Sequence, residues 1–300
     1  MTSKLIAEAC RMGLHVALCL SAWLAVSTVQ AAELSLCTAR ADGNYYAAGE
    51  IIRSRINANQ LKLVLRETAG SVDNLGRLAR GECDAAIVQL DAYLVYQEAN
   101  RRKRLELARP NYLYEEFVHL VCRRDAGLDS IEDLADGDGK HDVLIGEPES
   151  GSAATWRYFT ILDPGYAKTP ARTVGGAQAL AEVQKPGGAS CMLYVSGLRS
   201  KFSESVSNAG DTLALVPVDD PDLDEARFAG ERIYRFRKIP ARTYPALQAS
   251  DRKRDLKTLT VGATLFVTQS WAEANYDTNA YLVEVILRTK PEILERVAPR

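Results

Sequence analysis

The chain has 300 residues, of which 25% are charged and 47% are hydrophobic, the ordinary mixture of a folded globular protein. Its 37 Lys and Arg residues are balanced by 39 Asp and Glu residues, so that the formal net charge is −2. This balance argues against nucleic acid or an anionic membrane surface as a partner.

The N-terminus has the parts of an export signal in their usual order. Lys4 and Arg11 precede a run from Met12 to Val29 that contains no charged residue, and small residues follow up to Ala31. This pattern predicts a cleavable signal peptide over residues 1–31 and a mature chain that begins at Ala32. Because the run is about long enough to cross a bilayer, an uncleaved anchor is the alternative. No later segment is predicted to span a membrane.

The mature chain begins with strand and helix patterns in alternation. Glu33 to Thr38 is predicted to be a strand, and Gly43–Asn44 opens a helix with Tyr45 and Tyr46 in its first turn. The segment from Leu61 to Leu65 alternates apolar and polar residues, as a half-buried strand does.

The stretch from Ala69 to Asp91 contains a turn, a helix and a strand. Ser71 is placed to cap the helix, Gly81 ends it, and Asp84 to Val88 is a short apolar strand. With the preceding strand this makes a parallel crossover unit, and ligands of open α/β sheets gather beyond the carboxyl ends of the strands. We therefore expect four polar side chains at that edge: Ser71, Asn74, Gln89 and Asp91. The alternative is that Ser71 only caps the helix and Gln89–Asp91 only begins a loop.

The same design recurs later in the chain. After a helix at Asp91–Ala99 and a basic run at Arg101–Arg104, strands are predicted at Glu116–Arg123 and Val143–Gly146, and a turn at Pro148–Ser152 leads into another helix. The remaining elements are predicted as strands at Ala171–Val174, Ser190–Val195, Thr212–Val218, Ile233–Ile239 and Leu259–Val267, and helices after Gly175–Gly176, over Asp222–Ala229 and from Asp277. This alternation indicates an α/β fold with parallel sheets. Glycine turns form two sets, one before about Asp91 and one after about Gly146, which predicts two lobes that face each other across a cleft.

The four cysteines of the mature chain are far apart and lack the spacing of metal ligands. They are Cys37, Cys83, Cys122 and Cys191. An oxidising compartment allows one or two disulfides, with three full pairings that the sequence does not separate, and buried free thiols are an equally good interpretation.

No catalytic constellation stands out. The mature chain has only His119 and His141, neither of them in a pattern that orients a base, and nucleophile-elbow, Walker and dinucleotide motifs are absent. We therefore expect a protein that is not an enzyme and that holds no metal or cofactor. What the pattern offers instead is several helix N-termini around one cleft. Each stabilises an anionic group by roughly 0.3–1 kcal/mol, so several must converge to bind a small anion.

Seven short stretches, in the same order, make the chain resemble the TAXI group of extracytoplasmic solute-binding subunits, which serve tripartite ATP-independent periplasmic (TRAP) transporters. They are Gly43-Asn44-Tyr45-Tyr46 through Gly49, Ala69 to Leu75, Gly81 through Asp91, His119 to Val121, Gly146 through Ser152, Ile239 to Pro245 and Thr260 to Gly262. The resemblance implies an α/β, bilobal type II periplasmic-binding-protein fold with a two-segment hinge, and a location in the periplasm.

The resemblance also implies which residues contact the solute. Hydroxyls and amides donate to carboxylate oxygens, and tyrosine rings cover aliphatic carbons. The positions carried over are Tyr45, Tyr46, Ser71, Asn74, Gln89, Asp91, Ser150, Ser152 and Thr155, with Tyr194, Thr243 and Tyr244 in a secondary group. For each tyrosine the alternative is interior packing with a satisfied hydroxyl.

Three positions depart from the family pattern, so the identity of the ligand does not transfer. Ala39 to Gly43 replaces a glycine-rich turn, Leu90 stands where a small polar residue is frequent, and Arg242 stands where glycine is usual. Arg40 and Arg157 are candidates for a carboxylate clamp, with solvated surface positions as the alternative. An ammonium group on the ligand would face Asp91 or one of Glu115, Glu116 and Glu147.

The expected protein is a periplasmic receptor that binds a small anionic or zwitterionic solute and delivers it to the membrane permease subunits of a TRAP transporter. The lobes are predicted as residues 32–115 plus 258–300 and residues 116–257, with hinge segments near Glu115–Glu116 and Lys257–Leu259. Two alternatives use the same fold: a module that presents its closed form to a membrane sensor kinase, and a periplasmic enzyme.

Overall fold

The computed structural model describes residues 31–137, 139–198, 200–210, 212–248 and 254–297. The predicted signal peptide lies outside these residues except for Ala31. None of the helices in the described ranges combines the length and the apolar character that crossing a bilayer requires.

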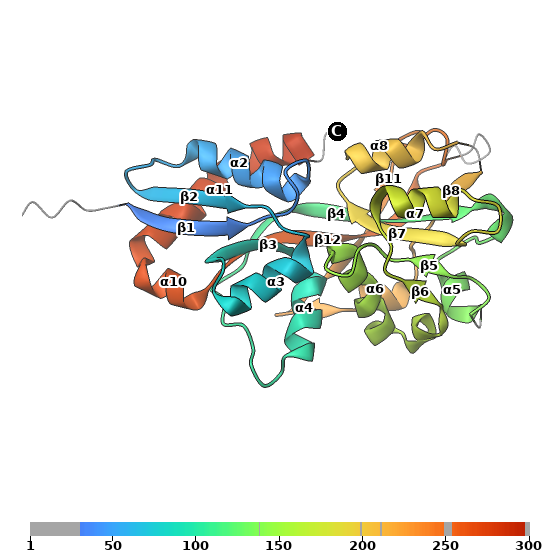
Figure 1. The fold of residues 1–300 in the computed structure, drawn as a ribbon, viewed down its shortest axis with the longest axis horizontal. Helices are drawn as coiled ribbons and strands as arrows, with labels where there is room; N and C mark the ends of the chain where they lie inside the picture. Colours follow the sequence, from blue (N-terminus) through green and yellow to red (C-terminus); the bar gives the residue numbers. More distant parts are fainter. Residues whose placement is uncertain (1–30, 138, 199, 211, 249–253, 298–300) are drawn as a thin grey trace, which may run out of the picture. The chain divides into compact units, whose positions relative to one another are not determined.

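Ten strands form one mixed sheet, in which each of the two long strands, β4 and β12, pairs with three other strands (Figure 1). The order along the main path is β2-β1-β3-β12-β4-β7-β5-β6, with β11 on β12 and β8 on β4. The strands are β1 (Ala32–Cys37), β2 (Leu61–Arg66), β3 (Ala85–Gln89), β4 (Asn111–Arg123), β5 (Val143–Leu144), β6 (Ala171–Arg172), β7 (Cys191–Ser196), β8 (Leu213–Val216), β11 (Tyr234–Ile239) and β12 (Leu256–Val267).

Strands β1, β2 and β3 pair in parallel, as the crossover pattern predicts. Strands β5, β6 and β7 are also parallel, but β12 runs antiparallel to β3, β4 and β11, and β4 runs antiparallel to β7 and β8. The prediction of parallel sheets was therefore wrong for the central strands β4 and β12. Apolar alternation is the same in both directions, so the pattern of β4 and β12 carries no sign of their orientation.

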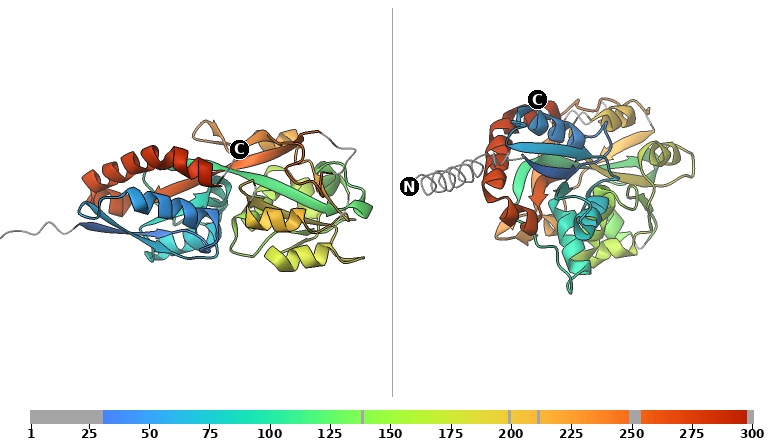
Figure 2. Two further views of the ribbon diagram at one scale, coloured as in Figure 1. Left: turned by 90° about the horizontal axis from the view of Figure 1, so that it is seen from above. Right: turned by 60° about the vertical axis from the view of Figure 1, so that its left-hand side comes forward.

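Helices cover both faces of the sheet, and α11 packs along α2 (Figure 2). The helix α3 begins at Ser71 and ends at Arg80, and its C-cap Gly81 has a φ of 69°, in the left-handed region that favours glycine. The helices are α2 (Asn44–Arg55), α3 (Ser71–Arg80), α4 (Leu90–Ala99), α5 (Glu132–Asp136), α6 (Gly151–Leu162), α7 (Gly176–Val183), α8 (Lys201–Ser207), α9 (Pro221–Asp224), α10 (Gln269–Ala274) and α11 (Tyr276–Val297), with 3₁₀ turns at Arg124–Ala126 and Pro164–Lys168.

The apolar residues form four cores, two in each lobe, because alternate residues of a strand face opposite sides of the sheet. In β3, Ile87 belongs to the core under α2 and α11, and Val88 to the core under α3. In β4, Leu120 faces the core under α6, and Val121 faces the core that includes residues of α7 and α8. We call the part with β1–β3, α2–α4, α10 and α11 the first lobe, and the part with β5–β11 and α5–α9 the second lobe.

Strands β4 and β12 run through both lobes side by side. On β4, Tyr114 packs in a core of the first lobe and Val118 in a core of the second. On β12, Val261 packs in the second lobe and Ala263 in the first, so the change occurs at Gly262. Gly262 lies opposite Glu115 in the strand pairing, a few residues beyond the predicted hinge segment at Lys257–Leu259.

The predicted helix over Asp222–Ala229 was wrong beyond its first turn. Only Pro221–Asp224 is helical, and the chain then forms a hairpin of β9 (Arg227–Phe228) and β10 (Glu231–Arg232). Its turn places Ala229 and Gly230 at φ values of 49° and 85°, which a helix does not allow.

The four cysteines form two disulfides, Cys37–Cys83 and Cys122–Cys191, which settles the pairing that the sequence left open. Cys122 and Cys191 are directly opposite each other on β4 and β7. Each bond lies within one lobe, so neither ties the lobes together.

Candidate functional site

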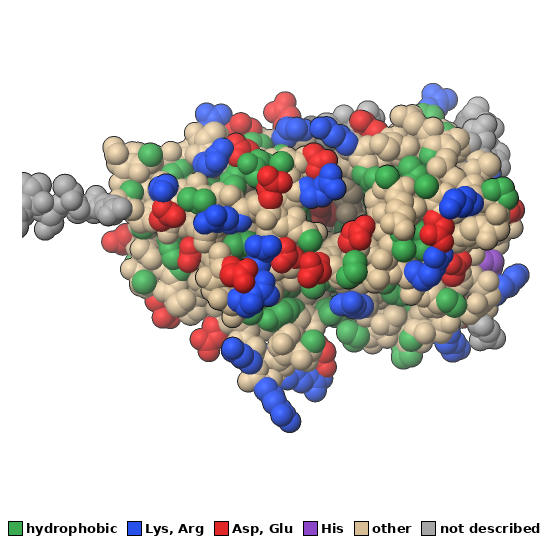
Figure 3. Space-filling model, in the orientation of Figure 1, with side chains coloured by type: hydrophobic (Ala, Val, Ile, Leu, Met, Phe, Trp, Pro, Cys, Tyr) green, Lys and Arg blue, Asp and Glu red, His purple; other side chains and the backbone are tan. Residues whose placement is uncertain are grey.

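The starts of α3, α4 and α6 meet where the two lobes face each other. Each of these helices follows a strand of a parallel unit, so the crossover topology brings their N-termini to the same edge. In Figure 3 the surface is hollowed between the part that carries α2 and α3 and the part that carries α7.

Glycines allow the lobes to come close at this point. A Cβ atom on Gly151, the first residue of α6, would overlap the side-chain oxygen of Gln89 and lie 3.1 Å from the hydroxyl of Ser71. Gly70 has a φ of 126°, and a Cβ there would lie 3.6 Å from the Cα of Ser150. A glycine turn from each lobe thus lies at this contact, and Gly151 leaves no room for a Cβ atom.

One polar group lies between α2, α3 and β4. The Tyr45 hydroxyl donates to Glu116 Oε2 at 2.8 Å and is 3.2 Å from Ser71 Oγ, which accepts a 3.1 Å hydrogen bond from the backbone N–H of Gln89. All four residues are buried. Burial raises the pKa of Glu116 to about 8, against the opposing effect of the hydrogen bond from Tyr45.

A second polar group joins the lobes through Asp91. Its carboxylate accepts hydrogen bonds from the Thr155 hydroxyl at 2.6 Å, the Tyr234 hydroxyl at 2.8 Å and the N–H of Ala92 at 2.7 Å. Gln89 adds a 3.2 Å bond from its side-chain amide to the Thr155 hydroxyl. Burial raises the pKa of Asp91 to about 6, while the hydrogen bonds from Thr155 and Tyr234 lower it. Asp91 therefore links α4 to the second lobe through its hydrogen bonds with Thr155 and Tyr234.

The first amides of α3 also have a partner in the opposite lobe. The N–H groups of Val72 and Asp73 donate to the carbonyl oxygen of Glu149 at 3.2 and 3.4 Å. The sequence analysis expects amides at helix starts such as this one to bind a small anionic solute. The same donors suit a carboxylate oxygen, because a helix start favours negative charge.

Several predicted contact residues have structural partners of their own. The amide of Asn74 donates to the carbonyls of Thr38 and Ile87 and so ties β1 to β3. Ser150 caps α6 by accepting from the N–H of Ala153, and the Ser152 hydroxyl accepts from the N–H of Val195 on β7. These residues lie at the meeting point, but their hydroxyl and amide groups already hold its walls.

The secondary tyrosines are in the interior of the second lobe. Tyr244 is 1% exposed and its hydroxyl is 2.8 Å from His119 Nε2, while the ring of Tyr194 stacks on the imidazole at 4.5 Å. Burial lowers the pKa of His119 to about 4. Thr243 is in the half-buried turn before Tyr244. Tyr194 and Tyr244 thus both contact His119 in this core, which fits the interior-packing alternative for the two tyrosines.

The two arginines and Tyr46 lie outside the polar groups. Arg40 is exposed and pairs with Asp42 at 3.2 Å, and Arg157 is exposed on α6. Half-buried Tyr46 lines a different hollow between α2 and α11, with Glu292 and Arg296 on its far side. The structure gives neither arginine a place at the polar groups.

Tyr234 belongs to the Asp91 group, and the sequence analysis missed it. It reaches Asp91 from β11, 143 positions along the chain, and nothing in its neighbours distinguishes it from a core tyrosine. Within the described ranges, no group of three or more His, Cys, Asp or Glu side chains is arranged to hold a metal ion.

The fold has many relatives among solved structures. The alkanesulfonate-binding protein SsuA from Xanthomonas axonopodis pv. citri, bound to MOPS, aligns with 89% of this chain and 76% of its own at 13% identity and a TM-score of 0.51. A mutant of ArgBP from T. maritima aligns over 88% and 94% at 11% identity and a TM-score of 0.50. The GluR0 ligand-binding core from Nostoc punctiforme, in complex with L-glutamate, aligns over 89% and 100% at 10% identity and a TM-score of 0.50. At these identities the likeness concerns the fold, and it confirms the predicted bilobal type II periplasmic-binding architecture.

A family model describes nearly all of the chain that follows the predicted signal peptide. The match runs over residues 36–292, from β1 to the last turns of α11, and so includes every residue of the Tyr45 and Asp91 groups. The chain belongs to the NMT1-like family.

Proposed function

We propose that this protein is a periplasmic solute receptor that captures a small carboxylate-bearing solute between its lobes. The observation that supports this most is the set of buried polar groups from both lobes at one contact, which includes Ser71, Gln89, Asp91 and Thr155. Buried polar groups need hydrogen-bond partners, and a solute with several acceptors can take the place of the present partners. The structure then corresponds to the closed form, with the Glu149 carbonyl on the amides that would receive a carboxylate.

The solute of this proposal is an amino acid. The amides of Val72 and Asp73 receive its carboxylate, and Glu116 receives its ammonium group through the neighbouring Tyr45–Ser71 cluster. An ammonium partner is suited to Glu116, because a buried carboxyl group is costly to ionise without a cation. Opening about β4 and β12, near Glu115 and Gly262, gives the solute access.

Thermal unfolding of the mature chain in the presence of single solutes tests the proposal. Each amino acid is compared with the acid of the same carbon skeleton that lacks the amino group. At about a hundredfold excess over Kd, a solute that binds only the folded protein adds roughly 2.7 kcal/mol, so its unfolding midpoint rises by several degrees. Tyr45→Phe should reduce this rise, whereas Tyr276→Phe, at a tyrosine that is 77% exposed, should not. Absence of any rise across the library at millimolar concentration contradicts the proposal.

The membrane partner in this proposal is a TRAP permease, and the support for it is the resemblance of the motifs. Gene order distinguishes this partner from the alternative. Genes for two membrane permease components beside this gene support delivery, whereas a neighbouring sensor-kinase gene supports a sensing module. Mass spectrometry of small molecules that remain bound through purification identifies the solute, and recovery of that solute unchanged excludes turnover.

A further inference from the structure

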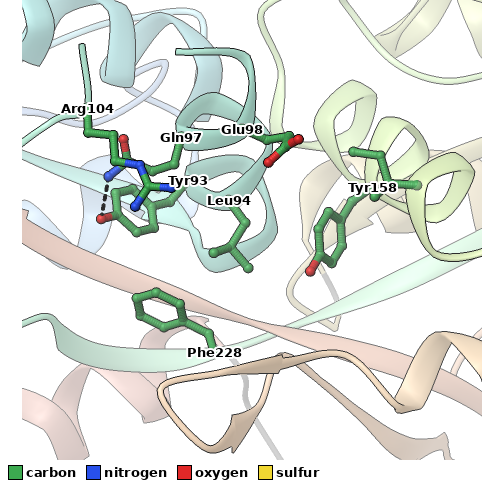
Figure 4. Close-up of a pocket in the computed structure, with 8 residues that line it drawn as sticks. Tyr93, Leu94, Gln97, Glu98, Arg104, Tyr158 and Phe228 are labelled. Carbon is green, nitrogen blue, oxygen red and sulfur yellow. Dashed lines mark hydrogen bonds between the residues drawn. The ribbon is translucent and has the colours of Figure 1, made fainter. Parts of the chain in front are cut away.

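A cavity away from the proposed solute site lies between α4, α6 and the β9–β10 hairpin (Figure 4). Its volume is about 320 Å³, and its wall is formed chiefly by Tyr93, Leu94, Tyr158, Ile161 and Phe228. None of these residues belongs to the Tyr45 or Asp91 groups. The proposed solute site therefore leaves this cavity unexplained.

The wall of the cavity is mostly apolar, although Gln97, Glu98 and Arg104 also line it. The ring of Tyr93 stacks on Phe266 at 4.9 Å and meets Phe228 edge-on at 5.8 Å. Ile161 is 52% exposed, although side chains of this kind are mostly buried in the described chain. An open apolar hollow with rigid aromatic sides is typical of a surface that receives a protruding side chain.

A basic loop borders the cavity. Arg101, Arg102, Lys103 and Arg104 are all exposed, and Arg104 lines the cavity mouth. Arg101 pairs with Glu98, but no acidic side chain of the described residues forms an ion pair with the other three. Figure 3 shows Lys and Arg side chains gathered on the loop that projects beyond α4. Among the described residues, Arg102, Lys103 and Arg104 therefore place positive charge at the rim without an ion-pair partner, beside Glu98, which also lines the cavity and pairs with Arg101.

The cavity depends on contact between the lobes. Its Tyr93 and Leu94 come from α4 in the first lobe, and its Tyr158 and Ile161 come from α6 in the second. Leu94 and Tyr158 each lie three residues beyond Asp91 and Thr155, whose side chains form the 2.6 Å hydrogen bond between the two helices. Separation of α4 from α6 would break that bond and divide the cavity.

We propose that this cavity and its basic loop form a docking surface for an acidic segment of the membrane partner, and that the surface is complete only while the lobes are in contact. The proposal rests on the proposed function for its membrane partner and for the opening of the lobes. A large apolar side chain of the segment enters the cavity, and flanking carboxylates face Arg102, Lys103 and Arg104. A concave cavity favours a protruding side chain over a flat lipid surface, and the unpaired cations favour an acidic segment.

Fluorescence anisotropy with the mature chain tests this proposal. The probe is a labelled ten-residue peptide with one tryptophan flanked by aspartates, and the matched peptide has lysines in place of the aspartates. At low salt the acidic peptide should bind more tightly than the lysine peptide. Its affinity should fall as salt is added, because salt screens exposed charges. The triple reversal of Arg102, Lys103 and Arg104 to Glu, and separately Ile161→Glu, should each weaken binding by about tenfold or more.

Leu287→Glu is the control, since Leu287 is 65% exposed on α11 and lies outside the cavity. It should leave peptide binding unchanged, and all three cavity and control variants should keep the thermal shift with solute. A solute shift without peptide binding overturns the docking surface alone, whereas loss of both contradicts the proposed function as well. Equal binding of both peptides, or binding only to vesicles that contain phosphatidylglycerol, also overturns the docking proposal.

Discussion

The hydroxyl of Tyr45 on α2 donates a 2.8 Å hydrogen bond to Glu116 on β4, which joins a helix of the first lobe to the strand that both lobes share. The carboxyl group of Glu116 is buried with Tyr45, and burial raises its pKa to about 8 from an ordinary value of 4.5. The folded protein therefore keeps this proton at pH values where the unfolded chain has released it. This difference in proton binding makes stability depend on pH.

Glu116 should make the free energy of unfolding fall as pH rises from 4.5 towards 8. Asp91 acts in the same direction only up to about pH 6, and His119, with its lowered pKa, costs stability as pH falls through 6.5. Between pH 6.5 and 8, Glu116 is thus the one of these three residues whose contribution to the free energy of unfolding changes, by at most about 1.4 kcal/mol per pH unit. Urea unfolding at several pH values should show that Glu116→Gln flattens this fall. Glu284→Gln, at an exposed acid on α11, should leave it in place, and an equal slope in both variants contradicts the assignment to Glu116.

Thr155→Val should loosen the contact between the lobes. The substitution keeps the shape of the side chain but removes the donor to Asp91 and the acceptor for the side chain of Gln89. Loss of a hydrogen bond to a charged group costs about 1.5–3 kcal/mol, so solute affinity should fall roughly 10- to 100-fold. Small-angle X-ray scattering of the solute-free variant should show a larger radius of gyration. Thr160→Val is the control on the same helix, because the Thr160 hydroxyl donates to the carbonyl of Arg157 within α6 rather than to the other lobe. A parental scattering curve from Thr155→Val would contradict a role of the Thr155–Asp91 bond in holding the lobes together.

Gly151→Ala should block the same contact between the lobes sterically, without removing a hydrogen-bonding group. The new methyl group overlaps the side chain of Gln89, which cannot move aside without losing its bond to Thr155. Solute affinity should fall by at least about tenfold, while α6 itself tolerates alanine. In the control Gly76→Ala, the new methyl group meets only the flexible end of Arg80, and alanine should stabilise α3 by about 0.5–1 kcal/mol. Isothermal titration of both variants provides the measurement, and unchanged affinity in Gly151→Ala would show that the lobes do not need to meet there.

The sequence analysis expected Ser71, Asn74, Gln89 and Asp91 at one edge, because strand–turn–helix units bring helix starts to the carboxyl ends of parallel strands. In the structure Ser71, Gln89 and Asp91 take part in the buried polar groups there, whereas Asn74 bonds to the backbone carbonyls of Thr38 and Ile87. The sequence analysis did not separate the faces of a strand. On β7, the N–H of Val195 bonds to Ser152, while the neighbouring Tyr194 faces the opposite core and stacks on His119. A shift of one residue decides between site and interior, and pattern alone does not contain that register.

The sequence pattern also did not predict contacts that depend on how distant segments of the chain pair or pack in the fold. Tyr234 reaches Asp91 only because β11 pairs with β12, and the Glu149 carbonyl that receives the α3 amides has no side-chain signature. The departure at Arg242 shows the converse. Its φ is 67°, in the left-handed region that favours glycine, the residue that the resemblance implies at this position.

The two disulfides should stabilise their own lobes without affecting capture of the solute. Cys37–Cys83 closes a separation of 46 residues in the first lobe, and Cys122–Cys191 closes 69 residues in the second. Restriction of the unfolded chain predicts a loss of about 4 kcal/mol for each pair replaced by serine, slightly larger for the longer loop. Urea unfolding of the Cys37→Ser/Cys83→Ser and Cys122→Ser/Cys191→Ser proteins measures this loss, with reduced parent protein as the control. Because neither bond crosses between lobes, titration well below the unfolding midpoint should give parental solute affinity. A pair whose removal weakens binding in a protein that remains folded would show that its bond acts on the contact between the lobes.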